Sequence, residues 1–557
     1  MTDLKIPVGI SDFAKIRNYD YYYVDKTGLI EDLLENETAE VTLITRPRRF
    51  GKTMGMSMLA NFFDIRKDSK AMFAGLQISK NATLCKEWMN QWPVVFLSFK
   101  NIDGDKFSLA YQQMVYEIGL LYDSYSELLT SNKLSEDDKA LFLQLKRRTA
   151  NEIDVLRSIQ FLLSLLYKHY GKTVILLLDE YDVPLAKSSA HGYYPDMLNV
   201  IKSMMTTSLK DNNTLRFAVI TGCLRIAKES IFTGTNNFVS DTISSSHLNE
   251  YFGFTQADVD QILKDADCME HADDIKNWYD GYHFGNLDVY CPWDVMNYLR
   301  DLQRNPKAKP ASYWKNTSDN SIIRSFIDYA GHSISRKLEI LLSGGYILQR
   351  IEENLTYDYL HSSEENLWSI LYLTGYLTQA REEDLPEPLP EGSSALMIPN
   401  AEVREIFETT IQKWFDESAQ TWNRKALFDA VWSGDTETLT KEMNKLLRKT
   451  ISYHDYREDF YHAFLAGIFA GAGYEVDSNK EHGEGRSDVV VLDPEGDRVA
   501  IFEAKYSRTQ DAIPRDCAAA LQQIEDRQYA KEFEEDYDSI LCYGIAFYKK
   551  RCLVQTK

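Results

Sequence analysis

Four short apolar segments, separated by longer stretches with helical periodicity, constrain the fold of the first 240 residues most strongly. They read VTLIT, PVVFLSF, TVILLL and LRFAVIT and occupy residues 41–45, 93–99, 173–178 and 215–221. A strand without polar alternation is buried on both faces, which requires helices on both sides of a parallel sheet. The alternation of strands and helices therefore predicts an α/β fold.

The junction after the first apolar segment carries a candidate phosphate-binding loop. Residues 46–53 read RPRRFGKT, so Gly51, Lys52 and Thr53 fall where a helix should begin. Backbone amides and the N-terminus of a helix attract phosphate oxygens. In such a loop the lysine contacts the β- and γ-phosphates, and the threonine hydroxyl holds Mg²⁺. The alternative interpretation is a chance Gly-Lys-Thr at the start of a helix.

The rest of this loop departs from the usual phosphate-loop pattern. Arg46 stands where that pattern has its first glycine, and Pro47 removes one backbone donor. Arg48 and Arg49 could neutralise phosphate charge, or they could pair with nearby acidic residues. Nucleotide binding and nucleotide turnover are therefore separate questions for this chain.

Acidic and polar residues follow the later apolar segments. Asp179 and Glu180 end the third segment, as expected for a carboxylate in the Mg²⁺ shell and a glutamate that polarises the attacking water. Thr221 ends the fourth segment, where it could sense the γ-phosphate. Arg225 could contact phosphate or a neighbouring subunit of a homo-oligomer, or form a surface salt bridge. The two motifs together, in this order, favour a P-loop NTPase domain over coincidence.

A second candidate site lies in a predicted β-hairpin near the C-terminus. Asp488 and Glu503 are equidistant from the Pro494-Glu495-Gly496 turn, so symmetric pairing makes them cross-strand neighbours on one face. Lys505 points to the same face because side chains alternate along a strand. Two facing carboxylates need a cation between them, and hard oxygen ligands favour Mg²⁺ or Mn²⁺.

The helix predicted before this hairpin adds a further acidic residue. Glu458 and His462 share one helical face beside an apolar stripe. Glu458 could assist a metal or a water, or it could be a solvated residue in the first helical turn. His462 is better explained as a hydrogen-bonded core residue than as a ligand.

Composition excludes several classes of protein. The net charge is −22, which argues against coating nucleic acid through bulk charge but allows local basic groups. The seven cysteines are scattered and form no CxxC, so we expect neither a disulfide framework nor a zinc site. The chain lacks a signal peptide and an apolar run of the roughly 20 residues that span a bilayer. We therefore expect a cytoplasmic protein without a membrane partner.

The first 240 residues resemble the AAA-ATPase-like family of bacterial proteins. The similar segments are IPVGISDFAKIRNYDYYYVDKTGLI, LITRPRRFGKT, LLLDEYDVP and ITGCLRIAKESIFTGTNNF. The resemblance implies an ATP site with Mg²⁺, and this family accommodates Arg46. It also implies that Asp25 and Lys26 lie near the nucleotide. The alternative for Asp25 is a helix N-cap.

Residues 455–557 resemble the PD-(D/E)xK nuclease superfamily and its small, restriction-endonuclease-like α/β domain. The similar segments are FYHAFLAGIFA, GYEVDSNKEHGEGRSD, FEAK and ALQQIEDRQYA. The resemblance implies that Asp488 and Glu503 bind the metal, that Lys505 orients or activates water, and that Glu458 and Gln523 support the site. The implied substrate is nucleic acid, with DNA favoured over RNA.

These observations predict four parts: the NTPase domain over 1–240, a helical lid or winged-helix-like region over 241–345, a helical connector over 346–450, and the nuclease-like domain over 451–557. The leading hypothesis is a nuclease coupled to an ATPase, which by analogy would act in defence against mobile elements. The alternative is a nucleotide-dependent switch or scaffold with little turnover. A nucleotide-binding partner in a toxin-like pair is a third possibility.

Overall fold

The computed structural model describes residues 4–35, 39–226, 238–314, 337–338, 340–355, 357, 363–410, 425–450, 461, 465–466, 468–469, 474–478, 481–482, 485–493, 496–534 and 536–557. The chain forms two compact units. One comprises Met1–Ile322 and Gly344–Ile406, and the other comprises Ile323–Ser343 and Phe407–Lys557. Each unit has its own sheet.

The first unit is built on a five-stranded parallel sheet with the order β2-β3-β4-β1-β5. Its strands are β1 (Val41–Thr45), β2 (Val94–Ser98), β3 (Val174–Asp179), β4 (Leu215–Gly222) and β5 (Phe238–Asp241). All six residues of β3 are buried, as an uninterrupted apolar run predicts. The α/β prediction is confirmed, and β5 is a strand that the sequence did not indicate.

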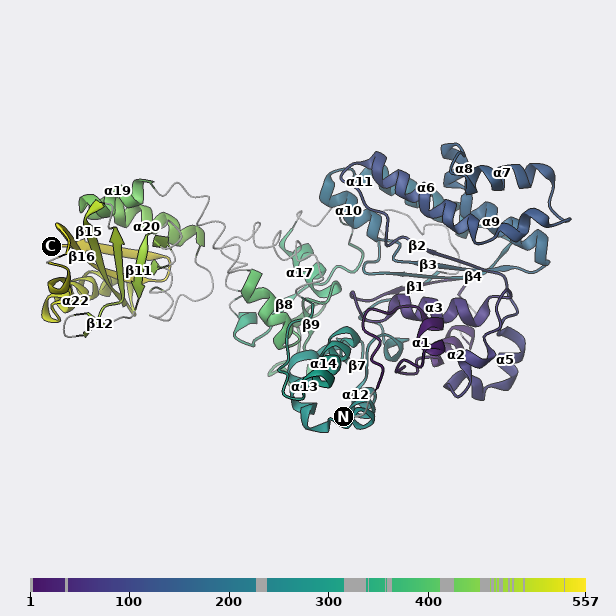
Figure 1. The fold of residues 1–557 in the computed structure, drawn as a ribbon, viewed down its shortest axis with the longest axis horizontal. Helices are drawn as coiled ribbons and strands as arrows, with labels where there is room; N and C mark the ends of the chain where they lie inside the picture. The colour runs from purple at the N-terminus through teal and green to yellow at the C-terminus, as the bar shows by residue number, and fades with distance from the viewer. Residues whose placement is uncertain are drawn as a thin grey trace. The chain divides into compact units, whose positions relative to one another are not determined.

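Helices cover both faces of this sheet (Figure 1). One face carries α1 (Phe13–Asn18), α2 (Gly28–Glu35), α3 (Lys52–Phe63) and α5 (Ala82–Trp88), and the other carries α6 (Phe107–Asp123), α9 (Ser158–Tyr170) and α11 (Tyr194–Leu209). In α9 the buried residues follow helical spacing, with Ile159, Leu162, Leu163 and Leu166 directed at the sheet. The helix ends at Gly171, whose φ of 70° suits a left-handed C-cap.

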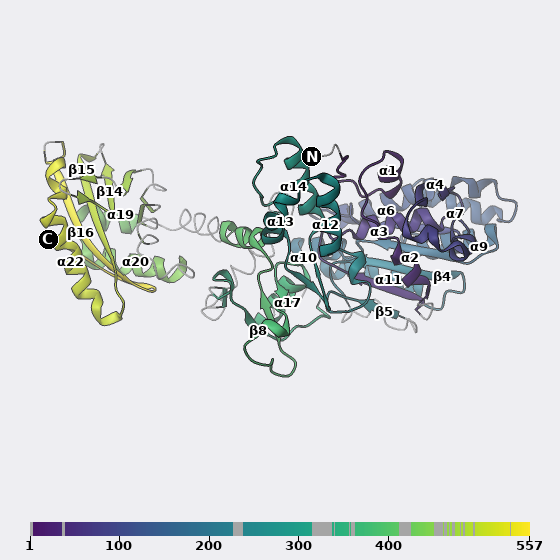
Figure 2. The ribbon, with the colours of Figure 1, turned by 90° about the horizontal axis from the view of Figure 1, so that it is seen from below.

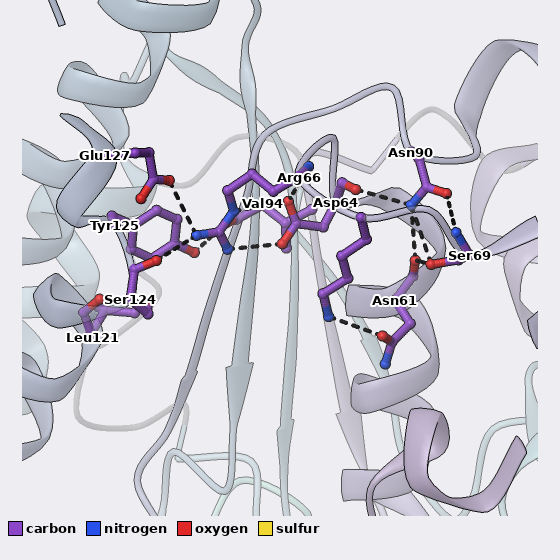
Figure 3. Close-up of polar contacts among 11 residues, drawn as sticks. Asn61, Asp64, Arg66, Ser69, Asn90, Val94, Leu121, Ser124, Tyr125 and Glu127 are labelled. Atoms are coloured by element: carbon purple, nitrogen blue, oxygen red, sulfur yellow. Dashed lines mark hydrogen bonds and ion pairs between the residues drawn. The ribbon is translucent and has the colours of Figure 1, made fainter. Parts of the chain in front are cut away.

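A polar network fixes the C-terminal end of α3, away from the phosphate loop (Figure 3). Arg66 pairs with Asp64 at 2.8 Å, and its guanidinium lies 3.9 Å from the ring centroid of Tyr125. The Tyr125 hydroxyl donates to the carbonyl of Val94 in the edge strand β2. Asn90 closes the other side of this network by donating to the Asn61 and Asp64 carbonyls. The end of α3 is therefore tied to the loops that follow α5 and α6 and, through Tyr125, to strand β2.

The middle region is mainly helical and packs within the first unit (Figures 1 and 2). It contains α12 (Gln256–Ala266), α13 (Ala272–Tyr279), the β6–β7 hairpin (Tyr282–Phe284 and Leu287–Val289) and α14 (Pro292–Arg304). The apolar side chains of Leu4, Ile6 and Val8 pack against these helices. A three-stranded antiparallel sheet, β8 (Ile347–Gln349), β10 (Ser394–Met397) and β9 (Thr378–Gln379), and α17 (Glu364–Leu373) follow. The sequence suggested a helical connector over 346–450. The described part of this segment also contains the strands β8, β9 and β10.

The second unit contains a mixed sheet with the order β11-β14-β15-β16-β17. Its strands are β11 (Glu475–Ser478), β14 (Val489–Asp493), β15 (Arg498–Tyr506), β16 (Ser539–Tyr548) and β17 (Arg551–Thr556). Helix α22 (Ile513–Asp526) covers one face, and α19 (Lys425–Ser433) and α20 (Thr436–Thr450) cover the other (Figures 1 and 2). The last strand, β17, forms one edge of the sheet.

Helices α19 and α20 belong to the core of this second unit. Their side chains share one apolar cluster with the sheet, whose members include Leu427, Val431, Leu446, Leu447, Val489, Val491, Phe502 and Ile545. Asn444 of α20 also donates to the Cys552 carbonyl and accepts from the Cys552 amide, each at 2.9 Å. The sequence placed these helices in a connector, whereas here they form one layer of the second unit.

Replacing Leu447 with alanine tests this assignment. Leu447 is fully buried against the sheet, so we expect a loss of about 2–5 kcal/mol of unfolding free energy. Hydrogen exchange at the β14 and β15 amides is the measurement, because these strands share its cluster. The exposed Glu437→Ala in the same helix should change stability by less than about 0.5 kcal/mol. Unchanged exchange in both strands of the Leu447 variant would contradict the assignment.

Candidate nucleotide and carboxylate sites

Asp179, the last residue of β3, is the centre of the polar network at the carboxyl end of the parallel sheet. Its side chain is fully buried. One carboxylate oxygen accepts from Thr53 Oγ1 at 3.0 Å and Ser98 Oγ at 3.2 Å. The other accepts from Thr221 Oγ1 at 2.7 Å. One carboxylate thus joins α3, β2 and β4. Its contacts bring together three of the predicted site residues, Asp179 itself, Thr53 and Thr221.

Lys52 lies at the base of the loop with its ammonium group turned toward the loop backbone. Its side chain is buried, and Nζ donates to the carbonyls of Arg46 at 2.9 Å and Pro47 at 2.8 Å. Gly51 precedes it with a φ of 88°, a left-handed conformation that favours glycine. The lysine therefore closes the loop on itself.

Arg46 anchors the loop to the edge of the sheet. Its fully buried guanidinium forms an ion pair with Asp241 of β5 and donates to Asn249 Oδ1 at 3.2 Å. The rings of Phe252 and Phe284 lie over it at 5.5 and 5.6 Å from their centroids. The residue that replaces a glycine of the usual pattern is thus a structural anchor, and its partner strand is the one that the sequence did not predict.

Glu180 follows Asp179 with an unusual backbone conformation. Its φ is 52°, a region that non-glycine residues rarely occupy. Burial raises the pKa of its carboxyl, although the charges of Lys52 and Arg48 oppose this effect. A glutamate held beside a phosphate loop with a raised pKa is suited to accept a proton.

A cavity of about 360 Å³ opens beside the loop. Gly51, Lys52, Thr53 and Glu180 form its polar end. Its other walls are mostly apolar and come from the N-terminal segment, the loop before α12, and α14; they include Val8, Ile10, Tyr23, Phe254, Trp293 and Met296. The cavity therefore combines phosphate-loop groups with an apolar chamber, the usual composition of a ligand site.

The remaining predicted nucleotide residues divide into two groups. Lys26 and Arg49 line the cavity, but Lys26 Nζ is bound to Asp258 at 2.6 Å, and Arg49 lies 5.0 Å from the Trp293 ring centroid. The exposed Arg48, the half-buried Arg225 and Asp25 are not among its lining residues. Asp25 instead accepts from the amides of Thr27 and Gln77 at 2.9 and 2.6 Å.

The hairpin of the second unit has the register on which the carboxylate prediction depended. Val489 pairs with Phe502 and Val490 with Ile501, so the next position of the ladder places Asp488 beside Glu503. Val490 and Ile501 point to the α22 face, where they share a cluster with Ile524. Because side chains alternate, Asp488, Glu503 and Lys505 face the same side.

The three side chains also have polar contacts that fit a charged site. Asp488 accepts from the Ala504 amide at 2.7 Å, and Lys505 Nζ lies 3.1 Å from Glu503 Oε1. Glu503 is only 1% exposed. Burial of two carboxylates beside a single lysine is unfavourable without further positive charge.

Of the residues expected to support the carboxylate site, only some lie in the part of the chain that the structure describes. Gln523 of α22 donates to the Tyr529 hydroxyl at 3.4 Å; Tyr529 was not singled out from the sequence. Glu458 and His462 lie outside the described residues, as do Pro494 and Glu495 of the turn.

Comparisons with known proteins identify the two parts of the chain in which these sites lie. Residues 7–232 match the family described as "Predicted AAA-ATPase", and residues 456–557 match the PD-(D/E)XK nuclease superfamily. The chain joins an AAA-ATPase-like domain to a PD-(D/E)XK nuclease-superfamily domain. It is also 26% identical to an "Uncharacterized protein in vnfD 5'region" of Azotobacter chroococcum mcd 1, over 98% of this chain and 97% of that protein. The likeness thus extends along both domains.

Besides Tyr529, two residues of these domains were not indicated by the sequence. Ser98 ends β2 of the ATPase-like domain, and its place beside β3 follows from strand order, which the sequence did not reveal. Gly544 of the nuclease-superfamily domain pairs with Glu503. A Cβ there would lie 2.5 Å from the Cys517 carbonyl oxygen, so glycine lets α22 approach the sheet beside the carboxylates.

Both donor sets have the chemistry of hard-cation ligands. Thr53 and Asp179 of the ATPase-like domain, and Asp488 and Glu503 of the nuclease-superfamily domain, supply oxygen atoms, which Mg²⁺ and Mn²⁺ prefer. Within the described ranges, no group of three or more His, Cys, Asp or Glu side chains is placed to hold a metal. The described part of the nuclease-superfamily site therefore contributes two carboxylates. None of the described helices is both long and apolar enough to cross a membrane.

The anchoring role of Arg46 predicts strong energetic coupling with Asp241. Arg46→Gly should lower the unfolding free energy by about 3–5 kcal/mol, because it leaves a buried carboxylate without its cation. Asp241→Asn should destabilise the domain for the converse reason. In urea unfolding, the loss of unfolding free energy in the double variant should be smaller than the sum of the two single losses by about 1–3 kcal/mol. Additive effects would show that the pair does not anchor the loop.

Proposed function

We propose that this protein is a metal-dependent nuclease whose activity is governed by nucleotide binding in its ATPase-like domain. The observation that carries the nuclease half is the β14–β15 register, which puts Asp488, Glu503 and Lys505 on one face of the hairpin. Membership of residues 456–557 in a nuclease superfamily supports it.

The proposed reaction is hydrolysis of a nucleic-acid phosphodiester. Asp488 and Glu503 would hold Mg²⁺ or Mn²⁺, which when bound lowers the pKa of water and neutralises phosphoryl charge. Lys505 would orient the attacking water and donate to the charged oxygens of the transition state. Gln523, held by Tyr529, would support the site from α22. Glu458 remains a predicted further ligand.

The nucleotide site is proposed to hold ATP in the 360 Å³ cavity. Amides after Gly51 and the Lys52 ammonium would contact the phosphates, and Thr53 and Asp179 would hold the accompanying Mg²⁺. The base would occupy the apolar chamber near Ile10 and Trp293. Glu180 would accept the proton of the attacking water, with Thr221 close to the γ-phosphate.

The second candidate function is a nucleotide-dependent switch with little or no turnover. Two contacts favour it: Lys52 is bound to loop carbonyls, and Arg46 is anchored to β5 in place of a mobile glycine. Both contacts restrain the loop, so any loop movement that a turnover cycle needs would be slowed.

The proposals on substrate, location, oligomeric state and biological role follow from the same two sites. DNA is the favoured substrate over RNA, and a reduced, cytoplasmic setting is the expected location. Arg225 is the residue that could reach a neighbouring subunit of a homo-oligomer. A role in defence against mobile elements is an analogy with proteins of similar build.

Substitutions in the carboxylate site test the nuclease directly. Asp488→Asn and Lys505→Ala should each lower metal-dependent cleavage of DNA at least about 100-fold, because each removes transition-state stabilisation. Single-stranded and duplex DNA and RNA are the substrates, with Mg²⁺, Mn²⁺ or chelator. Asp493→Asn is the matched control, because Asp493 is on the same strand and is paired with Arg498 at the turn. Equal cleavage by the wild type and both site variants on every substrate would refute the nuclease.

Nucleotide binding and turnover separate the two candidate functions. Lys52→Ala should weaken ATP binding at least about tenfold, since a charge-assisted phosphate contact contributes about 1.5–3 kcal/mol. Glu180→Gln should keep ATP binding and abolish hydrolysis if the domain is an ATPase. Calorimetry and phosphate release are the measurements. Tight binding by the wild type without phosphate release would favour the switch, and ATP affinity unaffected by Lys52→Ala would contradict the site.

A further inference from the structure

A basic groove lies at the edge of the nuclease-superfamily sheet, in addition to the carboxylate site. It encloses about 650 Å³ between α20, the edge strand β17 and the start of α22. Its lining includes three cationic residues, Lys441, Lys445 and Arg551. None of the described residues that line it is Asp or Glu, although the whole chain has 84 acidic against 62 basic residues.

The cations of this groove are available to a ligand. Lys441, Lys445 and Arg551 are exposed, and neither Lys441 nor Arg551 forms an ion pair with a described carboxylate. Among the described carboxylates, Lys445 pairs only with Glu442, an i,i+3 contact on its own helix that contributes little stability. Asn444 fixes the base of the groove by its two hydrogen bonds to Cys552. The groove therefore joins α20 to the edge strand β17.

The strand register places one wall of this groove, on β17, close to the carboxylate site, whereas Lys441 and Lys445 come from α20 on the other side of the sheet edge. Lys505 pairs with Ala546, and Ala546 pairs with Leu553, so the three form one row across the sheet. Leu553 lines the groove. Two strand spacings separate Lys505 from Leu553, a backbone distance of about 10 Å. Exposed Arg508 follows β15 in the chain, before the start of α22.

We propose that this groove binds the sugar–phosphate backbone of the nucleic-acid substrate, one or two phosphates away from the bond at the carboxylate site. This proposal rests on the proposed nuclease function. Lys and Arg contacts to phosphate release counterions and supply affinity that does not depend on sequence. A local cationic surface of this kind lets a protein of net charge −22 hold a polyanion.

Binding can be measured apart from cleavage. The full chain, with chelator present to prevent hydrolysis, is titrated with a fluorescein-labelled DNA duplex and an RNA duplex of the same sequence. Lys441→Gln/Arg551→Gln should weaken binding at least about fivefold and reduce the slope of log K against log salt by about 2. The effect should be the same for duplexes of different sequence.

The matched control lies on another face of the same unit. Lys531→Gln/Lys557→Gln removes two lysines that line a second pocket together with Glu525 and Glu534. Lys557 is paired with Glu525. This variant should bind like the wild type. Equal losses in both double variants, or no loss in the groove variant, would overturn the proposal, as would a wild type that binds neither duplex. Groove-dependent binding without cleavage by the wild type with metal would refute the nuclease and support the groove.

Discussion

The buried carboxylate of Asp179 is the interaction on which the phosphate-loop end of the ATPase-like domain depends. A charged group without solvent must be compensated, and here three hydroxyls from three elements surround it. The same contacts that satisfy the charge also fix the start of α3 against β2 and β4. Stability of the sheet edge and placement of the proposed metal ligands therefore come from one set of hydrogen bonds, so substitution of these hydroxyls would alter both.

The sequence was most informative where the signal is local. The apolar runs 41–45 and 173–178 predicted β1 and β3 because burial on both faces leaves no polar alternation. The hairpin around Asp488 and Glu503 was predicted to its register, since a short turn determines which residues oppose one another. Both predictions use only residues within one element or one turn.

The sequence was less informative where a partner lies far along the chain. Nothing near Arg46 indicates Asp241, because the pair depends on β5 joining the edge of the sheet. The amphipathic pattern of α20 reveals an apolar face but does not say which sheet covers it, so its residues read as a connector. Ser98 could not be assigned for the same reason: its role follows from strand order.

The anchoring of Arg46 has a consequence for the energetics of ligand binding. A glycine-rich loop loses conformational freedom when a phosphate orders it, and that loss reduces affinity. Here the ion pair to Asp241 and the hydrogen bond to Asn249 order the loop when the protein folds. The entropic cost is then incurred before any ligand arrives. A preorganised loop of this kind is less able to change conformation, but it loses less conformational entropy when a ligand binds. Its conformation depends on residues 241–249, about 200 positions away in the chain.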